Sequence, residues 1–136
     1  MSHVSLLAAD RPMPLYDSGI RRTECVTSGG YTVTTETPGF RVLPLDYYRG
    51  AVDDLGFAIK PYRYELDLRA TQEDARCLKE YLEDSCLPGE RVELWNLWVG
   101  DGPRRPIHYT GHLDDLDLDT LLQLEEREQT CMTIRR

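Results

Sequence analysis

The stretch RVELWNLWV, residues 91–99, constrains the fold of this chain more than any other part of the sequence. Successive side chains of a β-strand point to opposite faces of the sheet, so a strand with one solvated face alternates apolar and polar residues. Here one face carries Val92 and Leu94, and the other carries Trp95 and Leu97. The sequence therefore predicts a strand whose two faces both need a cover.

Strand and helix patterns alternate over the C-terminal half of the chain. Residues 62–69 alternate tyrosine or leucine with charged side chains, which predicts a strand with one buried face. Thr71, with Asp74 three residues later, is a predicted helix N-cap, and Asp117 is a second one. The turn-rich loop 100–105 predicts a hairpin between its two flanking strands. The predicted elements are strands over 62–69, 91–99, 106–113 and 130–135, and helices over 71–86 and 117–125.

The resulting order, βαββαβ from about residue 60 to residue 136, resembles the ferredoxin-like plan of α+β proteins. This resemblance implies an antiparallel sheet with both helices on one face. It also implies that strands 62–69 and 106–113 are adjacent and central, and that strand 91–99 is an edge. The plan hosts enzymes, regulators and binding modules alike, so it implies no activity.

The first 55 residues form a predicted extension of a single domain that spans residues 1–136. Within the extension, residues 31–44 predict a β-hairpin whose turn is Pro38-Gly39. Because two helices can cover only one face of the sheet, the second apolar face of strand 91–99 needs another cover. We expect this cover to be the N-terminal hairpin, with a bound partner or a second copy of the chain as the alternative.

Charge and hydropathy exclude several function classes. The 136 residues carry a formal net charge of −8, and 40% of them are hydrophobic and 29% charged, which is typical of a globular protein. No apolar run is long enough for a membrane span, and no signal peptide is evident, so the expected location is the cytoplasm. An acidic surface repels phosphate backbones, so we expect no direct binding of nucleic acid.

No motif for catalysis, metal binding or cofactor binding is present, and we predict no catalytic residue, metal or cofactor. The four cysteines show no CxxC spacing. His108 and His112 are four residues apart on a predicted strand, or about 13 Å at 3.3 Å per residue, too far to share one ion. In the predicted strand order, however, these histidines lie beside Glu65 and Asp67. That polar sheet face is the candidate site if the protein is a small enzyme or ligand-binding domain.

The leading hypothesis is a non-enzymatic, acidic protein-binding module. It would act as an inhibitor or regulator that occupies the basic surface of a nucleic-acid-handling protein, as a small DNA mimic does. The surplus aromatic residues of strand 91–99 and the acids after residue 113 are its candidate contacts. A structural subunit of a larger assembly is a further alternative, including a homodimer formed through edge strand 91–99. The predicted protein-binding residues are Trp95, Trp98, Asp114, Asp115, Asp117, Asp119, Glu125 and Glu126.

Overall fold

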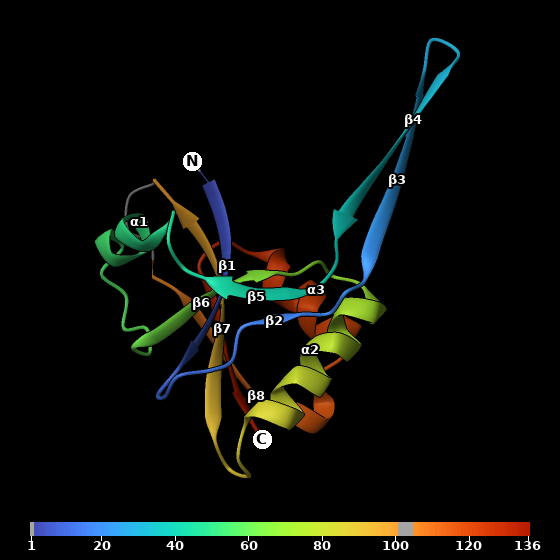
Figure 1. The fold of residues 1–136 in the computed structure, drawn as a ribbon. Coiled ribbons are helices and arrows are strands. Elements are labelled where there is room, and N and C mark those ends of the chain that lie inside the picture. Colours follow the sequence, from blue (N-terminus) through green and yellow to red (C-terminus); the bar gives the residue numbers. More distant parts are fainter. Residues whose placement is uncertain (1, 101–104) are drawn as a thin grey trace.

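The computed structural model describes residues 2–100 and 105–136 (Figure 1). They form one mixed sheet, one antiparallel sheet and three α-helices. Residues 101–104 of the predicted turn-rich loop 100–105 lie outside the described residues. A seven-stranded sheet has the order β2-β5-β6-β1-β7-β9-β8, and β3 and β4 form a separate two-stranded sheet. The strands are β1 (Ser2–Ala9), β2 (Tyr16–Asp17), β3 (Arg21–Ser28), β4 (Tyr31–Pro38), β5 (Arg41–Pro44), β6 (Tyr62–Asp67), β7 (Arg91–Val99), β8 (Ile107–His112) and β9 (Thr130–Arg135). The helices are α1 (Arg49–Asp54), α2 (Gln72–Ser85), the short 3-10 helix η1 (Leu113–Asp115) and α3 (Leu118–Glu126).

Strands β1 and β7 lie side by side in the middle of the large sheet. β7 pairs antiparallel with β1 on one side and with β9 on the other. Both strands are covered on both faces: Leu7 and Leu94 belong to one buried cluster, and Leu6 and Trp95 belong to another. The two apolar faces predicted for residues 91–99 are therefore both inside the protein.

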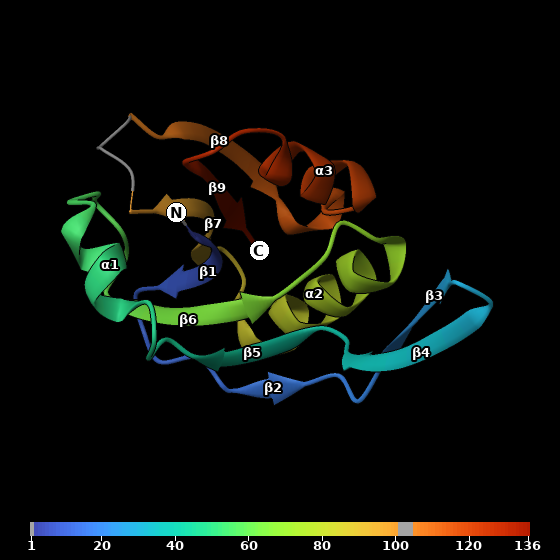
Figure 2. The same cartoon turned by 90° about the horizontal axis from the view of Figure 1, so that it is seen from above.

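The helices divide between the two faces of the sheet (Figure 2). Helices α2 and α3 contribute Leu78, Leu82 and Leu121 to one buried cluster, which confirms that both predicted helices cover the same face. Helix α1 contributes Val52 to the cluster on the other face, where Phe57 stacks against the Trp95 ring. The second cover is thus the α1 segment, and the expectation that the N-terminal hairpin supplies it is wrong.

The two predicted helix starts are confirmed by their caps. The Thr71 hydroxyl accepts a hydrogen bond from the Asp74 amide at 3.1 Å, and α2 begins at the next residue. The Asp117 carboxylate accepts one from the Thr120 amide, while the Thr120 hydroxyl accepts one from the Asp117 amide, which completes a capping box.

The ferredoxin-like layout is not confirmed, although the α+β class holds and the sheet is larger than predicted. Strands β6 and β8, predicted to be adjacent, are separated by β1, β7 and β9. β8 lies at an edge and pairs in parallel with β9, so 91–99 and 106–113 do not form a hairpin. Residues 2–9 insert as β1 between β6 and β7, and β9 lies between β7 and β8. Since β7 is then central, the predicted dimer through an edge at 91–99 is also excluded.

The N-terminal hairpin exists but has a different register from the one predicted. β3 pairs with β4 from Arg21 opposite Pro38 to Ser28 opposite Tyr31. Its turn is Gly29-Gly30, and both residues have positive φ (60° and 82°), which the tight hairpin turn requires. The predicted return strand after Gly39 instead becomes β5 and joins the large sheet beside β6. The hairpin therefore spans residues 21–38 and not 31–44.

Candidate protein-binding surface

The hairpin at residues 21–38, called the arm below, projects away from the rest of the protein (Figure 1). Its eight-residue strands extend roughly 27 Å at 3.4 Å per residue. Every residue from 23 to 36 is exposed, and no helix or second sheet packs over either face of the arm beyond its base. The arm is therefore a free two-stranded ribbon on a body that is otherwise well packed.

The two faces of the arm differ in chemistry. Residues that lie directly opposite one another share a face, and Val26 is opposite Val33. With Tyr31, which lies on the same face, these side chains form an apolar patch with exposed fractions of 63%, 58% and 79%. The other face is polar: the Thr27 and Thr32 hydroxyls are 3.2 Å apart. The arm is thus amphipathic, although no core covers its apolar side.

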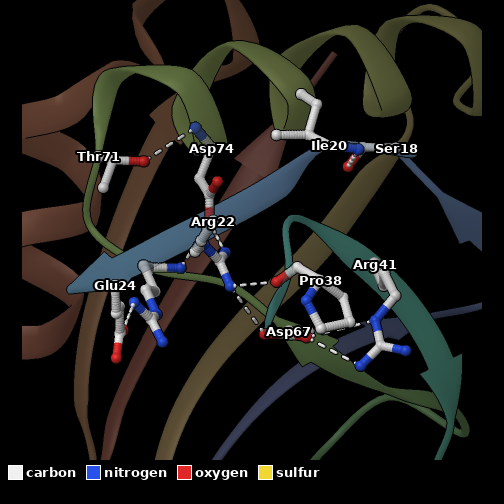
Figure 3. Close-up of polar contacts among 10 residues, drawn as sticks. Ser18, Ile20, Arg22, Glu24, Pro38, Arg41, Asp67, Thr71 and Asp74 are labelled. Carbon is white, nitrogen blue, oxygen red and sulfur yellow. Dashed lines mark hydrogen bonds and ion pairs between the residues drawn. The ribbon is translucent and has the colours of Figure 1, made fainter. Parts of the chain in front are cut away.

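An arginine holds the base of the arm to the body (Figure 3). Arg22 donates to the carboxylates of Asp74 in α2 and Asp67 in β6, and to the Pro38 carbonyl oxygen at 2.8 Å. Asp74 is only 2% exposed and also accepts a hydrogen bond from the Arg69 amide at 2.7 Å. Such a buried, charge-assisted network fixes the direction in which the arm leaves the body.

Two further contacts act at the same place. Arg69 donates to the Glu24 carboxylate at 2.8 Å, on the face of the arm that carries the apolar patch. The Gly39 amide donates to the Ile20 carbonyl oxygen, and a β-carbon at Gly39 would lie 2.9 Å from that oxygen. Only glycine allows this close approach of the two chains at the base. The arm is therefore anchored over its first residues and free beyond them.

A groove with three acids in its lining, called the acidic groove below, lies between the first turns of α2 and α3. It has a volume of about 770 Å³, and its lining includes Glu73, Asp117 and Asp119. Glu73 adjoins Asp74, the residue that holds Arg22, so the groove and the arm share the N-terminal end of α2. Arg76 and Lys79 also line the groove, but Lys79 donates to the Asp114 carbonyl oxygen and Arg76 pairs with Glu80. The acids of the groove remain directed at solvent.

The structure brings the predicted acidic residues onto one exposed flank around α3. Asp117 and Asp119 line the acidic groove, and they also line a second groove of about 680 Å³ with Glu125 and Glu126. The two remaining predicted acids lie in η1, immediately before α3. All six predicted acids, Asp114, Asp115, Asp117, Asp119, Glu125 and Glu126, are exposed.

The two predicted tryptophans do not belong to this surface. Trp95 has no exposed area, and its ring contacts Phe57 on one side and His108 on another. Trp95 is therefore a core residue, and the prediction that it belongs to a protein-binding surface is wrong. Trp98 is half-buried on the opposite face of β7, where its ring centroid lies 5.5 Å from that of His3.

The polar sheet face proposed for a small enzyme is not assembled. Glu65 lies on β6 and His108 on β8, four strand positions apart, or roughly 19 Å at 4.8 Å per strand. Burial raises the pKa of the Glu65 carboxyl, and the charge of Asp67 acts in the same direction. Asp67 itself is engaged with Arg22 and Arg41. These carboxylates and histidines cannot act on one substrate.

Cysteine and metal chemistry add no site within the described chain. Burial raises the pKa of the Cys86 thiol to about 11 and that of Cys131 to about 12, so both stay protonated. Cys25, on the polar face of the arm, is exposed. In the described segments no group of three histidine, cysteine or acidic residues could hold a metal ion. No helix within residues 2–100 and 105–136 is long and apolar enough to cross a membrane.

The sequence placed Tyr31 and Val33 in the predicted hairpin 31–44, but it missed Val26 and the true pairing of the arm, because the turn was assigned to Pro38-Gly39. The available signal was the pair Gly29-Gly30 between two β-branched runs, which is typical of a tight hairpin. A comparison of the chain with protein-family models, with curated proteins and with solved structures finds no match.

Proposed function

We propose that this protein is a non-enzymatic protein-binding module that holds a basic partner with the apolar face of its arm and the acidic groove between α2 and α3. The observation that carries the proposal is the arm itself. Three large apolar side chains are displayed on one face of a ribbon that no core supports. Exposed apolar patches of this kind typically mark interaction surfaces.

The energetics of the arm favour a partner. An isolated two-stranded hairpin is marginally stable in water, because each strand has only one neighbour and no packed face. Burial of one large apolar side chain contributes about 1.5 to 3 kcal/mol. Contacts with Tyr31, Val26 and Val33 would therefore stabilise both the complex and the arm.

Charge complementarity determines the kind of partner. Residues 21–38 contain two arginines and two glutamates, so the arm is neutral, whereas the whole chain carries a net charge of −8. The acids lie on the α2–α3 flank and line the acidic groove. Such a surface attracts a basic protein surface and repels nucleic acid. A nucleic-acid-handling protein, whose basic surface this flank would occupy as a DNA mimic does, has the required chemistry.

The test uses the exposed thiol on the polar face of the arm. A benzophenone maleimide attached to Cys25 leaves the apolar face free, and irradiation in a lysate of the native host cells captures what binds there. We expect a captured protein of basic isoelectric point. Its yield should fall in the arm variant Tyr31→Ser/Val33→Thr, in the acid variant Glu73→Gln/Asp119→Asn, and at high salt.

A matched control keeps the test specific. Thr32→Ser/Thr34→Ser changes the same strand on its polar face, and its capture yield should equal that of the unmodified protein. Capture that neither the arm variant nor the acid variant reduces would contradict the proposal. Capture of a second copy of the chain would favour the alternative role as a subunit of a self-assembled structure.

A further inference from the structure

One edge of the large sheet carries a group of three basic side chains, although the chain as a whole is acidic. β7 begins at Arg91, and its neighbour β9 ends at Arg135. The next strand, β8, ends at His112. Arg91 is paired in register with Arg135, and Arg135 with His112, so the three side chains form one row on one face of the sheet. Like charges directly opposite each other on neighbouring strands are destabilising. Two arginines in this position therefore need an explanation.

No acid within the described residues neutralises this row. Arg91, Arg135 and His112 are all exposed, and none has an ion pair with another described residue. The nearest acid along the same face of β7 is Glu93, two residues from Arg91. Its Oε1 atom accepts hydrogen bonds from the Lys60 amide at 2.9 Å and the Trp95 indole at 3.2 Å, and it forms no ion pair with Arg91 or Arg135. The N–H donors of the Arg91 and Arg135 guanidinium groups therefore have no hydrogen-bond partner among the described residues.

The row borders a pocket with further hydrogen-bonding groups. The pocket has a volume of about 320 Å³, and its lining consists of Arg91, Thr110, Gly111, His112, Thr133 and Arg135. Thr133 and Thr110 lie opposite each other on the next row of the sheet. The pocket therefore combines two fixed positive charges, an imidazole and two hydroxyl groups. Its size is at the lower limit of small-molecule sites.

We propose that this pocket binds the phosphate group of a small phosphorylated molecule. A guanidinium group matches two oxygens of a phosphate with two parallel N–H donors, and two such groups balance a dianion. The threonine hydroxyls and the histidine ring then reach the remaining oxygens. The net charge of −8 of the whole chain disfavours a long polyanion such as DNA, which would extend beyond the pocket. The site is separate from the arm and does not depend on the proposed function.

Thermal unfolding of the purified full chain tests this assignment with inorganic phosphate and glycerol 3-phosphate as probes. Ionic strength is held constant with chloride, so that only specific binding raises the Tm. We expect a saturable rise in Tm with both probes. In Arg135→Gln the apparent Kd should weaken by about tenfold or more, because one charged, bidentate donor is lost. Arg21→Gln, an exposed arginine without an ion pair in the described chain, is the control and should bind like the unmodified protein.

The variant also reports on the repulsion between the arginines. Without phosphate, Arg135→Gln should keep or raise the Tm, because Arg91 then faces a neutral residue. This separates loss of binding from loss of folding. The proposal is overturned if neither probe gives a saturable shift, or if Arg135→Gln binds both probes as well as the unmodified protein does. A short duplex DNA that binds more tightly than glycerol 3-phosphate, with the same sensitivity to Arg135→Gln, would overturn the assignment to a small molecule.

Discussion

Strands β1 and β3 have the same length of eight residues and both pair antiparallel, yet they lie in opposite environments. β1 has a neighbour on each side and buried side chains on both faces, whereas β3 has one neighbour and no covered face. β1 is thus stabilised by burial. The arm is stabilised by cross-strand pairing, a tight glycine turn and a few contacts at its base. A strand in this chain can therefore form without a core, and its apolar face then stays exposed.

A substitution in the core should lower the free energy of unfolding far more than one on the arm. Trp95→Ala removes a fully buried side chain packed against Phe57 and should lower the free energy of unfolding by about 3 to 5 kcal/mol. Tyr31→Ala on the arm should change it by no more than about 0.5 kcal/mol, because that side chain is exposed. Urea unfolding of both variants measures the difference. Equal effects would show that the arm packs on something in solution.

The anchor at the base of the arm comes next. Asp74→Ala leaves the Arg22 guanidinium without its buried partner and the Arg69 amide without an acceptor, and should cost about 3 kcal/mol of stability. Asp84→Ala, on the exposed face of the same helix, is the control and should stay within about 0.5 kcal/mol. Urea unfolding measures both variants. If Asp74→Ala is as stable as Asp84→Ala, the ion-pair network does not hold the arm.

A smaller effect concerns the pH dependence of stability, for which Glu65 in the body is compared with Glu36 on the arm. The raised pKa of Glu65 means that the folded state favours the protonated carboxyl. The associated stability is complete below the ordinary pKa of 4.5 and is lost as the pH rises through the higher folded pKa. Glu65→Gln should therefore raise the Tm at pH 7 relative to the unmodified protein, and this gain should vanish near pH 4. Glu36→Gln, on the exposed arm, removes one carboxylate without opening the core and is the matched control.

The smallest effect leaves stability untouched and concerns thiol reactivity. Cys25 lies on the exposed arm, whereas Cys77, Cys86 and Cys131 are buried. Burial also raises the pKa of each of these three thiols, which keeps them protonated and unreactive. A thiol reagent such as Ellman's reagent should titrate one fast cysteine in the native protein and four after denaturation. More than one fast thiol would mean that the body opens as readily as the arm.

The same contrast explains what the sequence could predict. Local signals were sufficient for α2 and α3, since their caps at Thr71 and Asp117 and their apolar stripes lie within a few residues of each other. They were also sufficient for β6, β7 and β9, whose patterns are strong. Strand order was not predictable, because pairing joins residues far apart in the chain and an apolar run such as 2–9 has no period that marks it as a strand.

The candidate surface was predictable only in part. The exposed acids around α3 follow from their charge, because such residues are rarely buried. The strand at residues 31–38 was predicted but its partner strand was not, since both Gly29-Gly30 and Pro38-Gly39 are turn signals in the sequence. Asp74 reads as an ordinary acid in the first turn of a helix. Its partner Arg22 lies 52 residues earlier, so only the folded chain shows their contact.

Hydrogen exchange of the backbone amides tests the central contrast most directly. If the arm is held only at its base, amides from residue 23 to 36 should exchange through local opening, with a free energy far below that of global unfolding. Amides of β1 and β7, for example those of Leu6 and Leu94, should exchange only by global unfolding. Arm amides as strongly protected as those of β1 and β7 in the isolated protein would contradict this account, because the apolar face would then already be covered.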